Sequence, residues 1–197
     1  SNPDEFDINM IVVPGVLQGI HPTVTTKAKN VAEARSDAFY VMDAFEYGTA
    51  VSSAITQVQS FDSSYVATYY PWVQIRDVDN NTYVWVPPSV PVAGVIAQND
   101  ALAHEWFAPA GLNRGITDAV QVKSRLTLAE RDDLYEARIN PIATFPGQGI
   151  CIWGQKTLQI RPSALDRVNV RRLLIAVKKF IASATKFLVF EQNNAAT

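Results

Sequence analysis

The segment AFYVMDAF, residues 38–45, decides the fold of this 197-residue sequence. Its apolar residues are almost continuous instead of alternating with polar ones, which is typical of a strand buried on both faces. Strands of this kind occur mainly in parallel sheets, where helices cover both faces. The segment therefore predicts an α/β protein.

The neighbouring segments extend this pattern in both directions. Residues 6–15, closed by Pro14 and Gly15, indicate another strand buried on both faces, and residues 64–75 a third strand. Helices are predicted at about 23–35 and 48–61, between these strands. Parallel strands need crossover connections, so this order predicts an α/β fold with a mixed, mainly parallel sheet and flanking helices. At this length we expect one domain spanning residues 1–197.

The middle of the chain predicts an antiparallel element. In VQIRDVDNNTYVWVPP, residues 73–88, Asp79, Asn80 and Asn81 separate two alternating segments, as in a hairpin turn. A helix should follow, with Ser89 as its N-cap.

Further along, the sequence carries helix and turn signals. Thr127 and Glu130 have capping-box spacing for a helix that we expect to stop at Asn140, because Pro141 disfavours helix before it. Gly147 and Gly149 predict turns beside a short buried strand.

Composition excludes several classes of protein. Hydrophobic residues make up 48% of the chain and charged residues 18%, which is typical of a globular protein and not of a disordered one. The sequence has no run of eighteen apolar residues and no signal-peptide pattern at its start, so we expect no membrane insertion. The single cysteine, Cys151, lies in an apolar string and is expected to be buried.

Charge is distributed unevenly along the chain. Residues 1–150 hold 9 basic and 17 acidic side chains, and residues 151–197 hold 8 basic and 2 acidic ones, which gives net charges of −8 and +6. Most of the excess lies in a helix predicted within RPSALDRVNVRRLLIAVKKFIASATKF, residues 161–187. At about 100° per residue, one sector of this helix is apolar and is expected to pack. That sector contains Val170, Leu173, Leu174, Val177, Phe180, Ile181 and Ala184.

The opposite sector of this helix is almost entirely cationic. Few acids are available within the helix to form ion pairs between residues i and i+4, so an acidic partner surface is one interpretation and a solvated face is the other. The candidate partner-contact residues are Arg167, Arg171, Arg172, Lys178, Lys179 and Lys186. Nucleic-acid binding is disfavoured, because no stacking platform or recognised motif accompanies the helix.

Catalytic patterns are weak throughout. The carboxyl ends of the predicted parallel strands would bring Gly15, His21 and Asp43 to one crevice, where an α/β enzyme or a small-ligand-binding domain would have its site. However, the sequence lacks a dinucleotide fingerprint, a phosphate loop and a nucleophile elbow. Two histidines and one cysteine make a zinc site improbable, so we expect no cofactor, no metal and no enzymatic activity.

Several segments in the second half occur in a specific order. They are WVPPSVPVAGVIAQND (85–100), WFAPAGLNRG (106–115), LTLAERDDLYEARINPIATFPGQGICIWGQKTL (126–158), DRVNVRRLL (166–174) and FEQNN (190–194). In this combination the chain resembles the tail sheath proteins of contractile-tailed bacteriophages and, more distantly, the sheaths of related contractile injection systems. The resemblance covers about residues 82–197, and the first 80 residues fit the family only by pattern.

The resemblance implies a structural protein. Family members assemble as stacked rings or a helix around a tail tube, and they contract to drive the tube through the host envelope. The implied partners are other sheath subunits and the tube protein, in a virion tail assembled in the host cytoplasm. The family's terminal strand-exchange arms have no counterpart in this sequence, so we expect a core fragment. The crevice near Gly15, His21 and Asp43 remains the alternative.

Overall fold

A five-stranded sheet forms the centre of the protein, for which the computed structural model describes residues 5–191. The strands lie in the order β1-β2-β3-β7-β8. Their bounds are Met10–Leu17 (β1), Phe39–Asp43 (β2), Val66–Tyr70 (β3), Ile139–Phe145 (β7) and Gly149–Ile152 (β8). Strands β1, β2, β3 and β7 are parallel and β8 is antiparallel to β7, so the predicted mixed, mainly parallel α/β sheet is confirmed.

Strand β2 shows why this sequence folds as a layered protein. All five of its residues are buried. Phe39 and Val41 belong to the apolar core on one face of the sheet, and Tyr40 and Met42 to the core on the other. Because both faces of the strand are apolar, helices must cover both.

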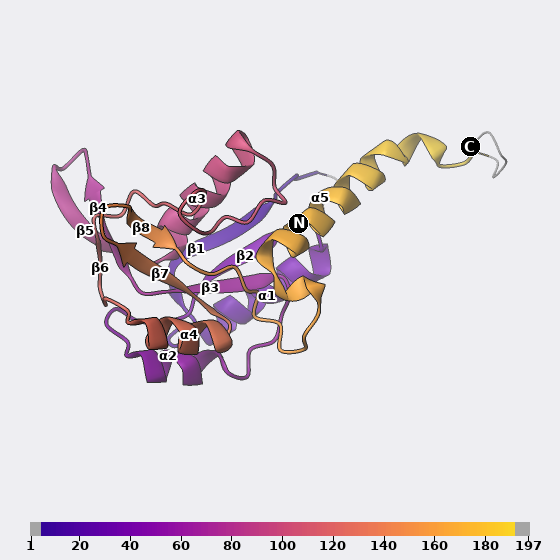
Figure 1. The fold of residues 1–197 in the computed structure, drawn as a ribbon. Helices are drawn as coiled ribbons and strands as arrows, with labels where there is room; N and C mark the ends of the chain where they lie inside the picture. Colours follow the sequence, from indigo (N-terminus) through magenta and orange to yellow (C-terminus); the bar gives the residue numbers. More distant parts are fainter. Residues whose placement is uncertain (1–4, 192–197) are drawn as a thin grey trace.

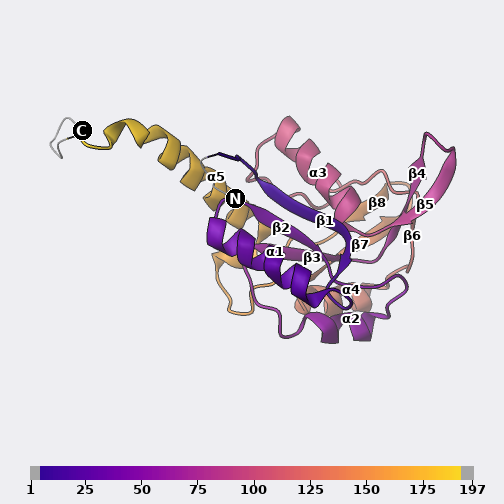
Figure 2. The same cartoon turned by 180° about the vertical axis from the view of Figure 1, so that it is seen from behind.

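Helices on the two faces complete three layers (Figures 1 and 2). One core joins the sheet to α1, α2 and α4, whose bounds are Pro22–Arg35, Val51–Val58 and Leu128–Glu136. The other core joins it to α3 (Ser89–Leu102) and to the beginning of α5 (Val168–Ala184). The rest of α5 leaves the body of the domain (Figure 1).

The predicted hairpin is confirmed as β4 (Val73–Asp77) and β5 (Thr82–Val86). It belongs to a second sheet of three strands, completed by β6 (Gln121–Val122). The Asp77 carboxylate shapes its turn by accepting hydrogen bonds from the backbone of Asp79 and Asn80. The predicted strand 64–75 is divided between the two sheets at Pro71.

The prediction that the first strand is buried on both faces is wrong. Strand β1 lies at the edge of the sheet, where it pairs only with β2, and its first residues are half-buried. It also continues past Pro14 and Gly15 as far as Leu17. An edge strand tolerates proline, and Gly15, at φ +80°, allows the irregularity seen in the pairing between Val12 and Leu17.

Two helix boundaries also differ from the predictions. The N-cap of α3 is Pro88, and Ser89 is the first helical residue. The Ser89 hydroxyl does not cap the helix and instead donates a 2.6 Å hydrogen bond to the Asp43 carboxylate. The capping box of Thr127 and Glu130 is confirmed, but α4 ends at Glu136 and Asn140 lies in β7. The chain turns at Arg138, which has a left-handed φ of 67° and donates hydrogen bonds to the carbonyls of Phe61 and Leu158.

The short buried strand and the turn predicted around Gly147 and Gly149 are both present in the structure, the strand as β8. Gly147 and Gly149 have positive φ values of 74° and 94°, as the predicted turn requires. Cys151 is buried in β8. The last three residues of the FEQNN segment, 192–194, lie outside the described residues.

Candidate assembly interface

The predicted contact residues lie on helix α5 and at its two ends, and the two halves of this helix have different surroundings. In the first half, Val168 is completely buried and Ile175 is 5% exposed, both within the core that includes α3. In the second half, the side chains of residues 180–184 are all exposed. We call residues 176–188, which include the short 3-10 helix Lys186–Leu188, the projecting segment.

The predicted orientation of α5 is wrong. The sector expected to pack contains side chains that are largely exposed, with Leu174 at 44% and Phe180 at 74%. The residues that enter the protein include two of the predicted surface cations, Arg171 at 8% and Arg172 at 4% exposure. A helical wheel gives the angle between sectors, but it does not say which sector faces inward when acids elsewhere in the chain can pair with the cations.

Arg171 packs against an aromatic ring. The centre of its guanidinium lies 4.0 Å from the centroid of the Tyr65 ring, and an N–H donates to the Ser64 hydroxyl. Burial lowers the pKa of Arg171 from its usual value. Its position fits a cation–π contact, for which a planar guanidinium is better suited than an ammonium group.

Arg172 forms a two-pronged ion pair with Asp100 at the end of α3. Its two terminal nitrogens lie 2.8 and 2.5 Å from the two carboxylate oxygens. It also donates to the carbonyl of Glu105, 3.2 Å away. This bidentate geometry joins α5 to the end of α3 and to the loop that follows.

Lys179 holds the segment that precedes β1. Its ammonium group contacts the Asp7 carboxylate at 2.6 Å and also donates to the Ile8 carbonyl and the Asn9 side chain. The hydrogen bond and charge of Lys179 lower the pKa of Asp7. At the other end of the helix, Arg167 contacts Asp166 and the Tyr135 hydroxyl.

The remaining two candidates lie on the projecting segment. Lys178 is exposed, and within residues 5–191 the structure gives it no hydrogen bond or ion pair. Lys186 is also exposed. Arg167, Arg171, Arg172 and Lys179 thus bind groups of the same subunit, and Lys179 lies on the projecting segment together with Lys178 and Lys186.

Sequence reasoning missed the exposed apolar row of the projecting segment. Phe180 is 74% exposed and Phe187 is 86% exposed. The other large apolar residues of the row are Val177, Ile181 and Leu188. The 3.6-residue periodicity of Val177, Phe180 and Ile181 is visible in the sequence, where it predicts packing within the subunit.

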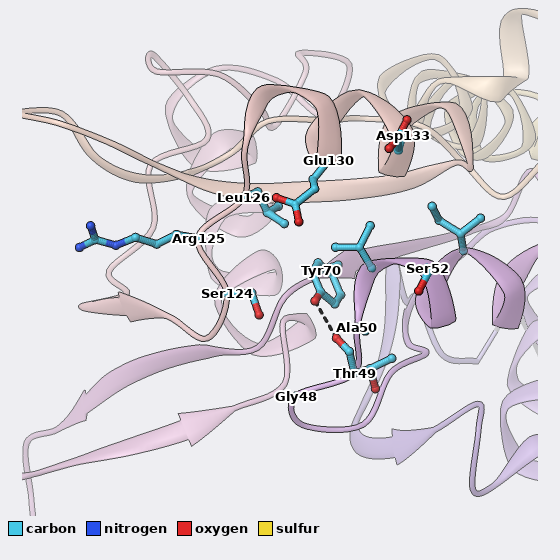
Figure 3. Close-up of a pocket in the computed structure, with 12 residues that line it drawn as sticks. Gly48, Thr49, Ala50, Ser52, Tyr70, Ser124, Arg125, Leu126, Glu130 and Asp133 are labelled. Atoms are coloured by element: carbon cyan, nitrogen blue, oxygen red, sulfur yellow. Dashed lines mark hydrogen bonds between the residues drawn. The ribbon is translucent and has the colours of Figure 1, made fainter.

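A groove lies between α2 and α4 on the opposite face of the sheet from α3. It consists of two cavities, of about 520 and 400 Å³, that share Ile55 and Asp133 in their linings. Its apolar lining includes Val51, Leu126 and Ala137. Figure 3 shows Glu130 and Leu126 directed toward the space above Tyr70, while Arg125 extends away from it.

The crevice near Gly15, His21 and Asp43 does not have the geometry of a ligand site. Asp43 is 1% exposed, and its carboxylate accepts hydrogen bonds from the backbone and hydroxyl of Ser89 and from the backbone of Gly15. Burial raises the pKa of Asp43, although these hydrogen bonds act in the opposite direction. His21 is exposed and accepts a hydrogen bond from the backbone of Leu17. Asp43 therefore connects β1, β2 and α3.

Two further searches concern the described part of the chain. His, Cys, Asp and Glu side chains in residues 5–191 form no group of three that could hold a metal ion. In the same residues, no helix combines the length and apolar character needed to cross a membrane.

Comparison with protein families gives a match over residues 4–158 to the family described as "Phage tail sheath protein central domain". The tail sheath protein of Enterobacteria phage T4 is 36% identical over 150 residues, which is 76% of this chain and 23% of that protein. The tail sheath protein of Vibrio phage KVP40 is 42% identical over 122 residues, which is 61% of this chain and 18% of that protein. The chain thus spans about a fifth of the length of these curated relatives.

The fold is also similar to a sheath whose structure has been solved. The helical sheath of the anti-feeding prophage (AFP) in its contracted state, determined by cryo-EM, matches with a TM-score of 0.76 and 27% sequence identity. The match covers 98% of this chain and 51% of that one, so it includes α5 as well as the layered domain.

Proposed function

This chain belongs to the phage tail sheath family, and on that basis we propose that it is part of a structural subunit of a contractile tail sheath. Copies of the subunit assemble with one another around a tail tube, as a helix or a stack of rings. Contraction of the assembly drives the tube through the host envelope. The subunit acts in the virion tail after assembly in the host cytoplasm.

The similarity to the contracted AFP sheath is the observation that supports this proposal most strongly. It extends over 98% of the chain at a TM-score of 0.76, so nearly the whole described fold has a counterpart in an assembled sheath. An enzymatic role has no comparable support, because Asp43 uses its carboxylate to join three elements of the fold.

The layered core is suited to a subunit that moves as a rigid body. Strands β2 and β3 are buried along their whole length between two apolar cores. Close-packed cores of this kind resist continuous deformation, so a change of lattice is expected to occur by rearranging contacts between subunits. Such contraction needs a metastable starting lattice and no nucleotide hydrolysis.

The proposed contacts with partners involve fewer of the six cations than the sequence indicated. Arg171 and Arg172 are buried with partners in their own subunit, and they serve the fold. The proposal therefore places contacts with the tube or with neighbouring copies on the projecting segment, where Lys178 and Lys186 are exposed.

Electron microscopy of the natural gene product that contains this chain tests the proposal. Expression with the tube protein from the same phage is expected to give tubes surrounded by a sheath. Dilution into conditions that trigger contraction should yield shorter, wider sheaths. Bare tubes beside a dispersed gene product, at concentrations where the tube itself assembles, would contradict the proposed function.

A further inference from the structure

We infer that the buried Asp43 carboxylate is a pH-sensitive joint at the edge of the central sheet. While it is ionised it holds both the start of α3 and a bulge of β1, and when it is protonated it keeps α3 and releases the bulge. The bulge comprises residues 13–16, between Val12 and Leu17, where the pairing with β2 shifts. The joint lies within the described fold, so the inference goes beyond the proposed function and stands or fails independently of it.

The bulge takes part of β1 out of its regular pairing with β2. Val12 pairs with Val41 and Leu17 pairs with Asp43, so β1 advances five residues while β2 advances two. Gly15 lies in the bulge, where it is exposed and has a φ of +80°. Its backbone N–H donates to Asp43 Oδ2 over 3.3 Å. The carboxylate thus ties the bulge to the end of β2 at a point where the strand pairing is interrupted.

The same carboxylate binds the first residue of α3. The Ser89 N–H donates to Asp43 Oδ1 over 3.0 Å, and the Ser89 hydroxyl donates to Oδ2 over 2.6 Å. The N-cap residue, Pro88, offers the helix no side-chain acceptor. Asp43 supplies these acceptor oxygens from a distant part of the chain, and the helix dipole favours a negative charge at this end.

No ion pair balances the Asp43 charge within residues 5–191, and the side chain is only 1% exposed. Strand β1 has no charged residue, and α3 has none before Asp100. The titratable side chains on the other elements around Asp43 are Tyr40 of β2, Tyr69 and Tyr70 of β3, and His21, Glu46 and Tyr47 of the adjoining loops. Burial and the charge of Asp43 raise the pKa of Tyr40 to about 12, so this phenol stays protonated while the carboxyl group titrates. Hydrogen bonds therefore carry the cost of burying this charge.

The hydrogen-bond donors determine which oxygen of Asp43 accepts a proton. Oδ1 faces the backbone N–H of Ser89, whose hydrogen cannot turn away. Oδ2 faces the Ser89 hydroxyl, which can rotate and accept a hydrogen bond instead of donating one. The proton therefore binds Oδ2, and the new O–H group donates to Ser89 Oγ.

Protonation of Oδ2 preserves the link to α3 and weakens the link to β1. The Ser89 N–H continues to donate to Oδ1, and the Ser89 hydroxyl now accepts. The Gly15 N–H, by contrast, donates to the oxygen that has gained the proton, and its hydrogen bond is already the longest of the three. Hydrogen bonds to an ionised acceptor are about twice as strong as those to a neutral one. Because Gly15 is exposed, water can replace the carboxyl group as its acceptor.

The effect of pH on the whole domain has the opposite sign to its effect on the bulge. Burial raises the pKa of Asp43 from 3.8, although the hydrogen bonds from Ser89 and Gly15 act in the opposite direction. The folded chain therefore binds this proton at a higher pH than the unfolded chain. The contribution of Asp43 to the free energy of unfolding thus rises as the pH falls through the raised pKa, and it is complete below 3.8. Acid should release the bulge without unfolding the domain.

An NMR titration of the isotopically labelled 197-residue chain tests the joint. The Asp43 carboxyl carbon should titrate with a midpoint above 3.8. Over the same pH range, hydrogen exchange of the Gly15 amide, relative to its intrinsic rate, should become about tenfold faster. The Gln18 amide is the matched control, because it donates to the backbone carbonyl of Asp43 and should keep its protection.

Three results of this titration would overturn the inference. The first is Gly15 protection that persists through the Asp43 midpoint, and the second is a midpoint at or below 3.8. The third is loss of Gln18 protection together with that of Gly15, because acid would then open the whole region and not the bulge alone.

A neutral side chain of the same shape gives a second test. In Asp43→Asn the side-chain oxygen can accept from the Ser89 N–H and the amide group can donate to Ser89 Oγ, which reproduces the protonated state. Exchange of the Gly15 amide should be about tenfold faster than in the wild type already at neutral pH, and acid should no longer change it. Equal exchange in the two proteins at neutral pH would contradict the inference. If Asp43→Asn does not fold, the titration of the wild type decides alone.

His21→Gln separates Asp43 from a second titratable group that binds β1. His21 accepts a hydrogen bond from the Leu17 N–H through Nδ1, and protonation of His21 would remove this acceptor. The acid-induced release of Gly15 should persist in His21→Gln with the same midpoint. Its disappearance would assign the pH effect to His21 and overturn the role inferred for Asp43.

Discussion

The two halves of α5 have a similar composition and opposite environments. In the first half of α5, Arg171 and Arg172 are buried and Leu174 is 44% exposed. In the projecting segment, Phe180 is 74% exposed while Lys179 is held by the chain segment before β1. Residue type alone therefore does not determine which side of this helix faces inward. A cation is buried where a carboxylate or an aromatic ring elsewhere in the fold contacts it, as Asp100 contacts Arg172 and Tyr65 contacts Arg171.

This contrast predicts that equivalent changes in the two halves have different effects. The largest difference should come from truncating apolar side chains. Ile175→Ala leaves a cavity in a buried site and should lower the free energy of unfolding by about 3 kcal/mol, whereas Phe180→Ala should change it by less than about 0.5 kcal/mol. Urea denaturation of the monomer at low concentration measures both. Equal losses would mean that the projecting segment is packed within its own subunit.

A somewhat smaller difference is expected for the cations. Arg172→Ala leaves Asp100 without its bidentate partner and should lower the free energy of unfolding by about 2 kcal/mol, allowing for the partial exposure of Asp100. Lys178→Ala should have an effect within about 0.5 kcal/mol. The same denaturation experiment compares the pair. A loss of stability in Lys178→Ala would show that Lys178 belongs to the structural set.

Exchanging arginine and lysine should change the free energy of unfolding in the first half of α5 by about 1 kcal/mol more than in the projecting segment. Arg171→Lys keeps the charge but loses the planar group over Tyr65, so the free energy of unfolding should fall by about 1 kcal/mol. Lys178→Arg, the reverse change at an exposed site, should be nearly neutral. If Arg171→Lys is also neutral, the contact with Tyr65 contributes through charge alone.

The smallest effect should be the pH dependence of the Lys179 contact. The pKa of Asp7 is lowered from 3.8 in the folded chain, so its contribution to stability is present above pH 3.8 and is lost as the pH falls through the lowered pKa. An NMR titration of the Asp7 carboxyl group should give a midpoint below 3.8. In Lys179→Met the midpoint should return toward the usual value. A midpoint that is the same in both proteins would show that the contact does not form in solution.

The sequence predicted the features that depend on local patterns. The continuous apolar residues of β2, the Asp79–Asn81 turn and the Thr127–Glu130 capping box all appear in the structure where they were expected. Each depends on residues close together in the chain, for which periodicity and side-chain chemistry are sufficient guides. The strand order that places β7 beside β3, with a hairpin, α3, β6 and α4 between them in the chain, could not be derived in this way.

Features that depend on distant partners were not predictable. Arg172 meets Asp100, 72 residues away, and Lys179 meets Asp7, 172 residues away. The local pattern predicts that Ser89 caps its helix, but the Ser89 hydroxyl donates its hydrogen bond to the Asp43 carboxylate. In each case the local interpretation was reasonable, and a tertiary contact replaced it. The groove between α2 and α4 was missed for the same reason, because its two walls come from segments far apart in the chain.

The contacts of Arg172 and Lys179 also define a path for mechanical load. A force applied to the end of α5 passes through Arg172 into the end of α3 and through Lys179 into the segment that leads to β1. Strand β1 pairs with β2 at residues 10–12 and again at Leu17, so the load is shared by hydrogen bonds of the central sheet. These two ion pairs add to the buried contacts of the first half of α5, so we expect tension on the helix to turn the whole domain before the helix separates from it.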